Sequence, residues 1–176
     1  WDKNYEIFFY SVVLTILITL IGIFHEKLHL ETSVISGLTL VGALHILGGH
    51  VSVGATRLYD FWFIQDIFKY DNLVHFIAYY VVALVAYSLL YPHLDKKTKH
   101  NWFLLGFLVF LIAMGVGAGA EITELFAVML FDASTAVGDY YNNAFDLVFN
   151  LLGSISACIY LIIYHNIGHK KRNSKK

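Results

Sequence analysis

The sequence predicts an all-α membrane protein, a polytopic bundle of about five transmembrane helices that forms one domain over residues 1–176. Of the 176 residues, 58% are hydrophobic and only 14% are charged, whereas soluble domains contain about 25% charged residues. The chain also has five long apolar runs, and a helix needs about 20 mostly apolar residues to cross the hydrocarbon layer. Because lipid offers no hydrogen bonds to an exposed backbone, we expect each run to be helical.

The five predicted spans follow one another with short connections. No small-residue cleavage site follows the first run, so we expect that run to stay in place as a helix. The chain begins with Trp1 rather than Met, which leaves room for a missing leading segment. The single proline, Pro92, comes near the end of the third run, so the helices can continue without interruption. The spans are predicted at residues 5–24, 33–53, 71–94, 101–131 and 143–165.

The distribution of Lys and Arg predicts the orientation of the chain. Residues 95–100 hold three of them and residues 169–176 hold five, which with Lys27 makes nine of the chain's twelve. Cytoplasmic loops are enriched in these residues. We therefore expect an outside amino terminus, a cytoplasmic carboxyl terminus and a multi-pass protein of the inner cell membrane. The basic tail is expected to contact anionic lipid.

The segment "RLYDFWFIQDIFKY", residues 57–70, connects the second and third spans. It is rich in aromatic residues but is interrupted by five charged or amide side chains. This mixture is typical of a helix or loop that lies in the membrane interface, where aromatic rings prefer to sit. We expect it at the outer surface, either as a plain aromatic anchor or as a partial cover over a polar site.

Polar side chains from four predicted spans fall at one membrane depth, near the outer boundary. A helix rises about 1.5 Å per residue, which places the glutamates of "GAGAEITELF" about 30 Å along the fourth span. Ionisable groups at such depth normally face the bundle interior or a wet cavity. The candidate site residues are Asp71, His75, Glu121, Glu124 and Asp146, with His45, His50 and Asp139 as candidates to complete the set.

The spacing of these residues predicts shared helix faces. Asp71 and His75 form an i,i+4 pair, and Glu121 and Glu124 form an i,i+3 pair. Neighbouring glutamates repel each other unless a cation, a proton or a basic partner intervenes. Because few Lys or Arg residues lie on this side, we expect a divalent metal or a shared proton as the counter-charge. Mixed carboxylate and imidazole ligands suit zinc, manganese or iron, whereas oxygen ligands alone suit magnesium or calcium.

Each of these residues also has a purely structural interpretation. A lone intramembrane histidine such as His45 or His75 is more often a satisfied hydrogen-bond donor than a ligand. Asp146 can cap the fifth helix at its amino end, and Asn143 or Asn150 can hydrogen-bond between helices. Only the combination of acids and imidazoles on one side of the membrane favours a functional site.

Three stretches of the sequence resemble a known family. "YDNLVHF", "GAGAEITELF" and "GDYYNNAFDLVFNLLGS" are similar to the signature of the YjdF-like family of small bacterial and archaeal membrane proteins. A looser likeness links the chain to VanZ-like proteins, although the arginine that often precedes their last motif is missing. The resemblance implies a polytopic helical membrane fold and points to the same acids, but it brings no reaction with it. The matching positions are Asp71, His75, Phe76, Glu121, Asp146, Asn150 and Gly153.

These observations favour an integral membrane protein with a carboxylate and histidine cation-binding site in the outer leaflet. If the protein is an enzyme, metal-assisted hydrolysis or transfer on a lipid-linked substrate fits best, with Glu121 or Glu124 as the general base. Glu121 and Glu124 are thus the candidate catalytic residues. The alternative is a non-catalytic accessory subunit of a larger membrane complex, or a bundle that conducts protons or metal ions.

Several classes of protein are disfavoured by the same sequence. It contains no HExxH motif, no repeated Glu-x-x-His element, no serine nucleophile elbow and no phosphate-binding loop. A net charge of −1 argues against a nucleic-acid partner. The single cysteine, Cys158, allows no intrachain disulfide. The expected partners are therefore membrane lipids, and either a lipid-linked substrate or other membrane proteins.

Overall fold

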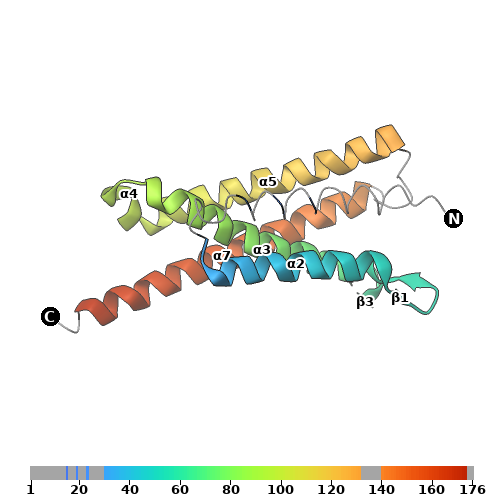
Figure 1. Ribbon diagram of the computed structural model, residues 1–176, viewed down its shortest axis with the longest axis horizontal. Coiled ribbons are helices and arrows are strands. Elements are labelled where there is room, and N and C mark those ends of the chain that lie inside the picture. Colours follow the sequence, from blue (N-terminus) through green and yellow to red (C-terminus); the bar gives the residue numbers. More distant parts are fainter. Residues whose placement is uncertain (1–14, 16–18, 20–22, 24–29, 132–139, 174–176) are drawn as a thin grey trace.

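The chain folds into long helices that run along a common direction, as the computed structural model in Figure 1 shows. The structure describes residues 15, 19, 23, 30–131 and 140–173, the side chains of 131 and 166–173 excepted. The long helices are α2 (Thr32–His50), α3 (Tyr70–Leu90), α5 (Trp102–Phe131) and α7 (Tyr140–Asn173). The short helical pieces are η1 (Leu58–Asp60), η2 (Tyr91–His93) and α4 (Lys96–His100).

Four helical stretches in the described part of the chain are long and apolar enough to cross a membrane. Their presence confirms the predicted all-α membrane bundle, and they correspond to the second to fifth predicted spans. The first predicted span, residues 5–24, lies outside the described residues apart from positions 15, 19 and 23. The four stretches are Thr32–His50, Tyr70–His93, Trp102–Leu130 and Tyr140–His165.

The helix ends differ from the predicted span ends for local reasons. The second span was expected to reach residue 53, but α2 ends at His50 because Val51 adopts an extended backbone (φ −92°, ψ 140°) that leads into a strand. The third was expected to reach residue 94, but α3 gives way to η2, which contains Pro92. α7 continues past residue 165 to Asn173, since Lys and Arg are good helix formers.

The connection between α2 and α3 forms two short antiparallel hairpins. One pairs β1 (Ser52–Val53) with β2 (Thr56–Arg57), and the other pairs β3 (Trp62–Ile64) with β4 (Phe68–Lys69). Each hairpin has a turn residue with positive φ, Gly54 at 65° in the first and Asp66 at 58° in the second. Such backbone suits Gly and is tolerated by Asp. The segment is therefore neither the continuous helix nor the irregular loop of our prediction, because it is built of paired short strands and the one-turn helix η1.

Helix α3 contacts each of the other three long helices, and its longest interface is with α7. Gly153 makes this interface possible: a Cβ atom added there would lie 2.2 Å from the backbone oxygen of Phe76. Only glycine can therefore occupy this position while the two backbones are in contact. Small residues allow the same close approach at many contacts between membrane helices. This close approach sets the register between the two helices that carry most of the polar residues.

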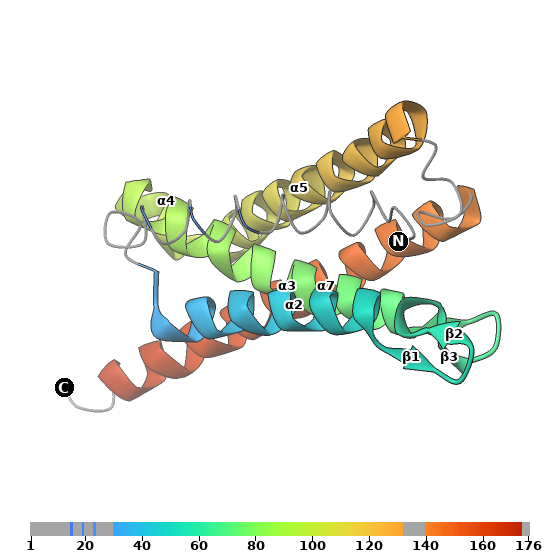
Figure 2. The ribbon, with the colours of Figure 1, turned by 45° about the vertical axis from the view of Figure 1, so that its right-hand side comes forward.

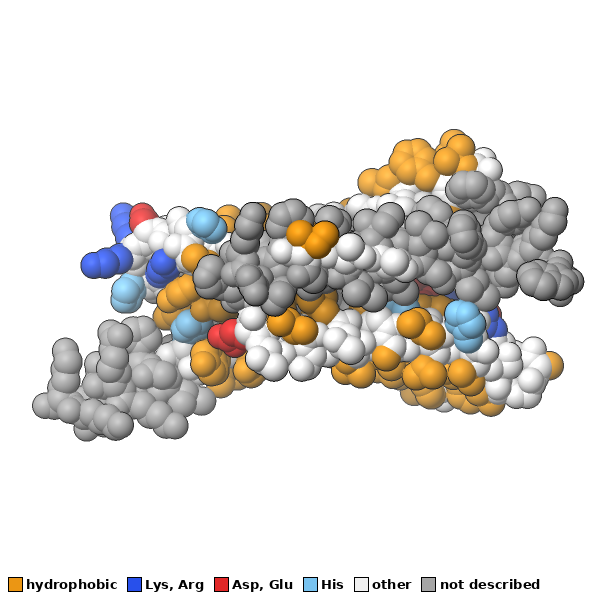
Figure 3. Space-filling model, in the orientation of Figure 1, with side chains coloured by type: hydrophobic (Ala, Val, Ile, Leu, Met, Phe, Trp, Pro, Cys, Tyr) orange, Lys and Arg blue, Asp and Glu red, His pale blue; other side chains and the backbone are white. Residues whose placement is uncertain are grey.

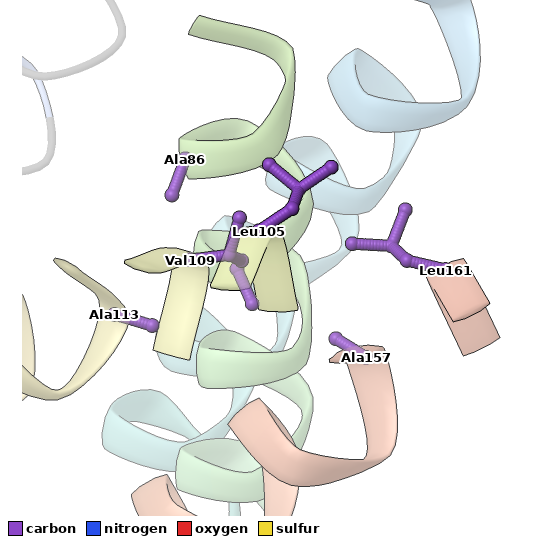
Figure 4. Close-up of a cluster of buried hydrophobic side chains, with 7 residues drawn as sticks. Ala86, Leu105, Val109, Ala113, Ala157 and Leu161 are labelled. Atoms are coloured by element: carbon purple, nitrogen blue, oxygen red, sulfur yellow. The ribbon is translucent and has the colours of Figure 1, made fainter. Parts of the chain in front are cut away.

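Small apolar side chains fill the space between α3, α5 and α7 on the α4 side of that contact. Figure 4 shows Ala86, Val109 and Ala157 in this cluster, one from each helix. Val109 and Ala157 are fully buried. The four alanines, one valine and two leucines of this cluster give dispersion contacts between close backbones. These contacts matter because lipid supplies little hydrophobic drive between helices.

Many large apolar side chains lie on the outside of the helices. Phe103 is 83% exposed and Met129 is 69% exposed, which is the arrangement expected of a lipid-facing surface. The hairpins and α4 lie at opposite ends of the bundle (Figure 2). Figure 3 shows that Lys and Arg side chains gather mainly at the α4 end. The bundle thus has one basic end and one end that carries the hairpins.

Candidate functional site

The first turn of α3 brings two predicted site residues together. The side-chain oxygen of Asn72 accepts a hydrogen bond from the backbone N–H of Lys69 at 3.0 Å, which closes the amino end of the helix. Asp71 and His75 then lie one turn apart on one face, with His75 Nε2 3.5 Å from Asp71 Oδ1. The side chain of His75 is 11% exposed and that of Asp71 is 15% exposed. The two groups therefore form a nearly buried pair.

Helix α7 supplies the opposite wall of the site. Asp146 is 1% exposed and Asn150 is fully buried. Asp146 Oδ1 lies 3.9 Å from His75 Nε2. Asn150 Oδ1 lies 2.9 Å from His75 Nδ1, and since an amide oxygen can only accept, Nδ1 carries the hydrogen. In a neutral imidazole this leaves the lone pair on Nε2, the nitrogen that faces both aspartates.

Neighbouring amides and an amine hold the two aspartates in place. Asn72 donates to Asp146 Oδ1 at 3.2 Å, and Asn142 donates to Asp146 Oδ2 at 2.7 Å. The ammonium of Lys69 lies 2.9 Å from Asp71 Oδ2 and also hydrogen-bonds to Asn142. The Oδ1 atoms of both aspartates are left on the side of His75.

Helix α5 adds a third carboxylate, Glu121. The residue is 8% exposed, and its Oε1 lies 3.9 Å from His75 Nδ1. Both carboxylate oxygens are buried without a hydrogen-bond partner in the described part of the chain, as is Asn150 Nδ2. A buried carboxylate is costly unless it is protonated, paired or bound to a cation. Glu121 therefore marks a place where a counter-charge or a proton is needed.

The donor atoms of Asp71, His75 and Asp146 are grouped closely enough that they could hold a metal ion. Each residue offers one ligand atom, and these three atoms lie within 4.8 Å of one another. Ligands that share a metal at about 2.0–2.2 Å lie up to roughly 4.4 Å apart, so small side-chain rotations suffice to close this set. One imidazole nitrogen with carboxylate oxygens is a donor set used by zinc and by manganese or iron.

Comparison with known proteins places the chain in a family. The model of the family described as "Predicted membrane protein (DUF2238)" matches residues 2–167. The chain belongs to this family. Membership of the DUF2238 family, together with the four apolar helices, establishes it as a membrane protein. No curated protein and no solved structure matches the chain.

The remaining predicted site residues of this DUF2238 protein do not belong to the three-ligand group or lie outside the described residues. Glu124 is half-buried, one turn beyond Glu121 on α5, and belongs to no three-ligand group among the described residues. The ring of His45 hydrogen-bonds to the hydroxyl of Tyr59 in η1. His50 is exposed, and its ring bonds to the backbone oxygen of Ile46 at 3.0 Å. Asp139 lies outside the described residues.

The hairpin segment meets the site through its last residue. Lys69 ends β4 and contacts both Asp71 and Asn142. The ring of Phe68 lies 5.6 Å from that of Phe149 on α7, which joins the hairpin to the same wall. The segment thus borders the site, which fits a partial cover better than a plain aromatic anchor, and its place at the outer surface stays a prediction.

Sequence reasoning missed the supporting amides of the site. Asn72 was not singled out, and neither Asn142 nor Lys69 was assigned a role beside the acids. A signal was present in the spacing, because Asn142, Asp146 and Asn150 recur every four residues and so share one face of α7. Such a stripe of amides and an acid along a membrane helix predicts contacts with another polar helix face.

Proposed function

We propose that this membrane protein binds one divalent metal ion, either zinc, manganese or iron, through Asp71, His75 and Asp146. The observation that carries the proposal is the convergence of one imidazole nitrogen and two carboxylate oxygens within 4.8 Å of one another. The hydrogen bond from His75 Nδ1 to Asn150 supports it, because this bond turns the ligating nitrogen toward the aspartates.

The balance of charge also supports a cation. Lys69 is paired with Asp71, and His75 is the basic group that lies 3.9 Å from both Asp146 and Glu121. Carboxylates in a low-dielectric site repel one another strongly. A divalent ion beside them offsets this repulsion, and Glu121, whose Oε1 lies 3.9 Å from the other ring nitrogen of His75, is placed to act as a proton acceptor.

In a catalytic form of this proposal, the substrate is lipid-linked and the reaction is hydrolysis or group transfer. A divalent ion supplies Lewis-acid activation of water or of a polar substrate bond. Glu121 is the favoured general base because both of its oxygens are free of hydrogen-bond partners in the described part of the chain. Glu124, one turn away and half-buried, is the second candidate.

A non-catalytic role is the second candidate function. The ion pair of Lys69 with Asp71 at 2.9 Å shows that part of the negative charge is already balanced. If His75 is protonated against Asp146 and Glu121 holds a proton, the cluster is neutral without a metal. The protein would then be an accessory subunit of a larger membrane complex, or its acids would line a proton path.

The site is proposed to lie in the outer leaflet of the inner membrane. The α4 end of the bundle carries most of the Lys and Arg side chains in Figure 3, and the site lies at the hairpin end. With the basic end in the cytoplasm, the hairpins and the cluster face outward. A cysteine placed at Lys97 should resist labelling by an impermeant reagent added outside intact cells.

The motif likenesses are consistent with this proposal. A YjdF-like assignment agrees with membership of the DUF2238 family. The likeness to VanZ-like proteins stays a hypothesis, but its aspartate, histidine and asparagine positions are the residues that meet between α3 and α7. We therefore propose that these positions have the same chemical role in VanZ-like proteins as in this chain.

Metal analysis of the purified full chain tests the proposed function. We expect one zinc, manganese or iron ion per chain, and loss of that metal in His75→Ala and Asp146→Asn. Metal affinity should fall by more than the about 10–100-fold that is typical when only a hydrogen-bond partner of a ligand is removed. His50→Ala is the matched control, because that histidine is exposed and its ring bonds to the backbone of its own helix. A folded chain that binds none of these metals at millimolar concentration would overturn the proposal.

A further inference from the structure

Asn150 lies at the junction of the three helices that build the site. It is fully buried on α7, its Oδ1 accepts from His75 on α3 at 2.9 Å, and its Nδ2 faces α5. A Cβ atom added at Gly117 of α5 would lie 3.2 Å from that Nδ2. The amide thus spans from the imidazole to the helix that carries Glu121.

The orientation of this amide has a chemical consequence for His75. Imidazole can ligate a cation through either ring nitrogen, and the nitrogen that carries hydrogen cannot ligate. Asn150 Oδ1 holds the hydrogen on Nδ1, so Nε2 keeps its lone pair on the side of Asp71 and Asp146, which lie 3.5 and 3.9 Å away. Partners behind a ligating histidine fix its tautomer and raise its basicity.

The α5 glycine beside Asn150 makes room for this arrangement. A Cβ atom at Gly117 would also lie 3.2 Å from a ring carbon of Tyr79, so a larger residue would press on both neighbours. Gly119, two residues further along α5, has nothing within 4 Å of its added Cβ. A side chain at position 117 would therefore press on Asn150, whereas one at position 119 would not.

We propose that Asn150 is a positioning residue of the cation site, which selects Nε2 of His75 as the ligating nitrogen, and that Gly117 provides the space for it. This inference rests on the proposed function and extends it to the choice of the ligating atom. It predicts that cation affinity depends on a hydrogen-bond acceptor at position 150 and on the absence of a side chain at position 117.

The test measures Zn²⁺ affinity of the full chain in detergent by competition with a chelating indicator, and Co²⁺ absorption as a report of the ligand set. Asn150→Leu should weaken Zn²⁺ binding about 10–100-fold and change the Co²⁺ spectrum. Asn150→Asp keeps an acceptor oxygen and should restore both the affinity and the spectrum. Asn143→Leu, on the same helix and outside the cluster, should leave both unchanged.

A second pair of variants keeps the test decisive if Asn150→Leu does not fold. Gly117→Ala should weaken Zn²⁺ binding, and Gly119→Ala should bind as the unsubstituted chain does. Equal Zn²⁺ affinity of the unsubstituted, Asn150→Leu and Gly117→Ala chains would overturn the positioning role alone. Failure of Asn150→Asp to restore a loss seen in Asn150→Leu would also overturn it. Failure of the unsubstituted chain to bind Zn²⁺ would overturn the proposed function, and this inference with it.

Discussion

The two ends of the interface between α3 and α7 use opposite kinds of side chain. Toward the hairpins, the helices meet through Asn72, Asp146 and Asn150, each at most 1% exposed. Toward α4, they meet through Ala83 and Ala157, both fully buried. The same pair of helices thus has a polar half and an apolar half, with the Gly153 contact between them.

The difference between the halves separates packing that stabilises the bundle from buried charge that packing does not require. Apolar packing between membrane helices stabilises through close contact of small residues, and the alanine half meets that need. Hydrogen bonds between amide side chains could by themselves hold α3 and α7 together in the polar half, as they do between many membrane helices. Instead the polar half also buries Asp146 and, from α5, Glu121, which cost stability unless a charge compensates them. The polar half therefore contains more charge than a joint between helices requires.

The largest effect is expected at the contact between the halves. Gly153→Leu must separate α3 from α7, because even its Cβ would lie 2.2 Å from Phe76 O. We expect the chain to lose about 3 kcal/mol or more of stability, at or beyond the upper range for overpacking, and to lose metal binding as well. Denaturant unfolding in detergent measures the first effect. Gly119→Ala is the control, since its Cβ meets open space; equal stability of the two variants would contradict the close contact.

A change in the apolar half should affect stability without affecting the site. Val109→Ala removes two methyl groups from a fully buried position, and we expect a loss of about 1–2 kcal/mol through a small cavity. Zn²⁺ affinity should stay unchanged, because this cluster shares no residue with the proposed metal ligands. A parallel fall in affinity and stability would show that the two halves are coupled.

A weaker effect is expected from the polar contact at the far end of the apolar half. The hydroxyl of Tyr87 hydrogen-bonds to His165 Nε2 at 2.6 Å, and the ring of Trp102 stacks on that histidine with centroids 4.2 Å apart. Tyr87→Phe should cost about 0.6 kcal/mol, the average for a hydrogen bond between membrane helices. Thermal unfolding of the variant measures this loss, and Tyr140→Phe, at an exposed tyrosine, is the matched control.

The smallest effect is expected outside the membrane, at the cap of α4. The backbone N–H of Thr98 donates to the Asp95 carboxylate at 2.6 Å and holds the pKa of Asp95 below its ordinary value. The folded-state pKa is depressed, so the cap contributes above the unfolded-state pKa near 3.8 and its contribution is lost as pH falls through the folded-state value. Asp95→Asn should remove this pH dependence, measured by unfolding from pH 2 to pH 6, with little change elsewhere.

The sequence predicts the long helices well, because they follow from hydropathy. The depth of the acids in the membrane follows from the rise per residue and stays a prediction. It also predicts that Asp71 and His75 share a face, since i,i+4 spacing is local. The partners across the interface are different: Asn72 and Asn142 meet Asp146 only because the Gly153 contact sets the register of α7 on α3. The register between two helices depends on how they pack in three dimensions. The residue spacing within one helix does not reveal it.

The hairpins show a second limit of the sequence. Strands of two or three residues are too short to display an alternating pattern. Their turns depend on Gly54 and Asp66, and the second of these tolerates positive φ without requiring it. Aromatic content predicts that the segment lies at the interface, but it does not distinguish a hairpin from a helix.

Anomalous diffraction from the full chain loaded with Zn²⁺ tests the central claim most directly, because it locates the ion without relying on activity. The account predicts a single strong peak at the zinc edge in the polar half of the α3–α7 interface. It should lie about 2.0–2.2 Å from His75 Nε2 and from a carboxylate oxygen of each aspartate, Asp71 and Asp146. A saturated crystal with no peak between these three side chains, or with zinc bound only elsewhere on the chain, would contradict it.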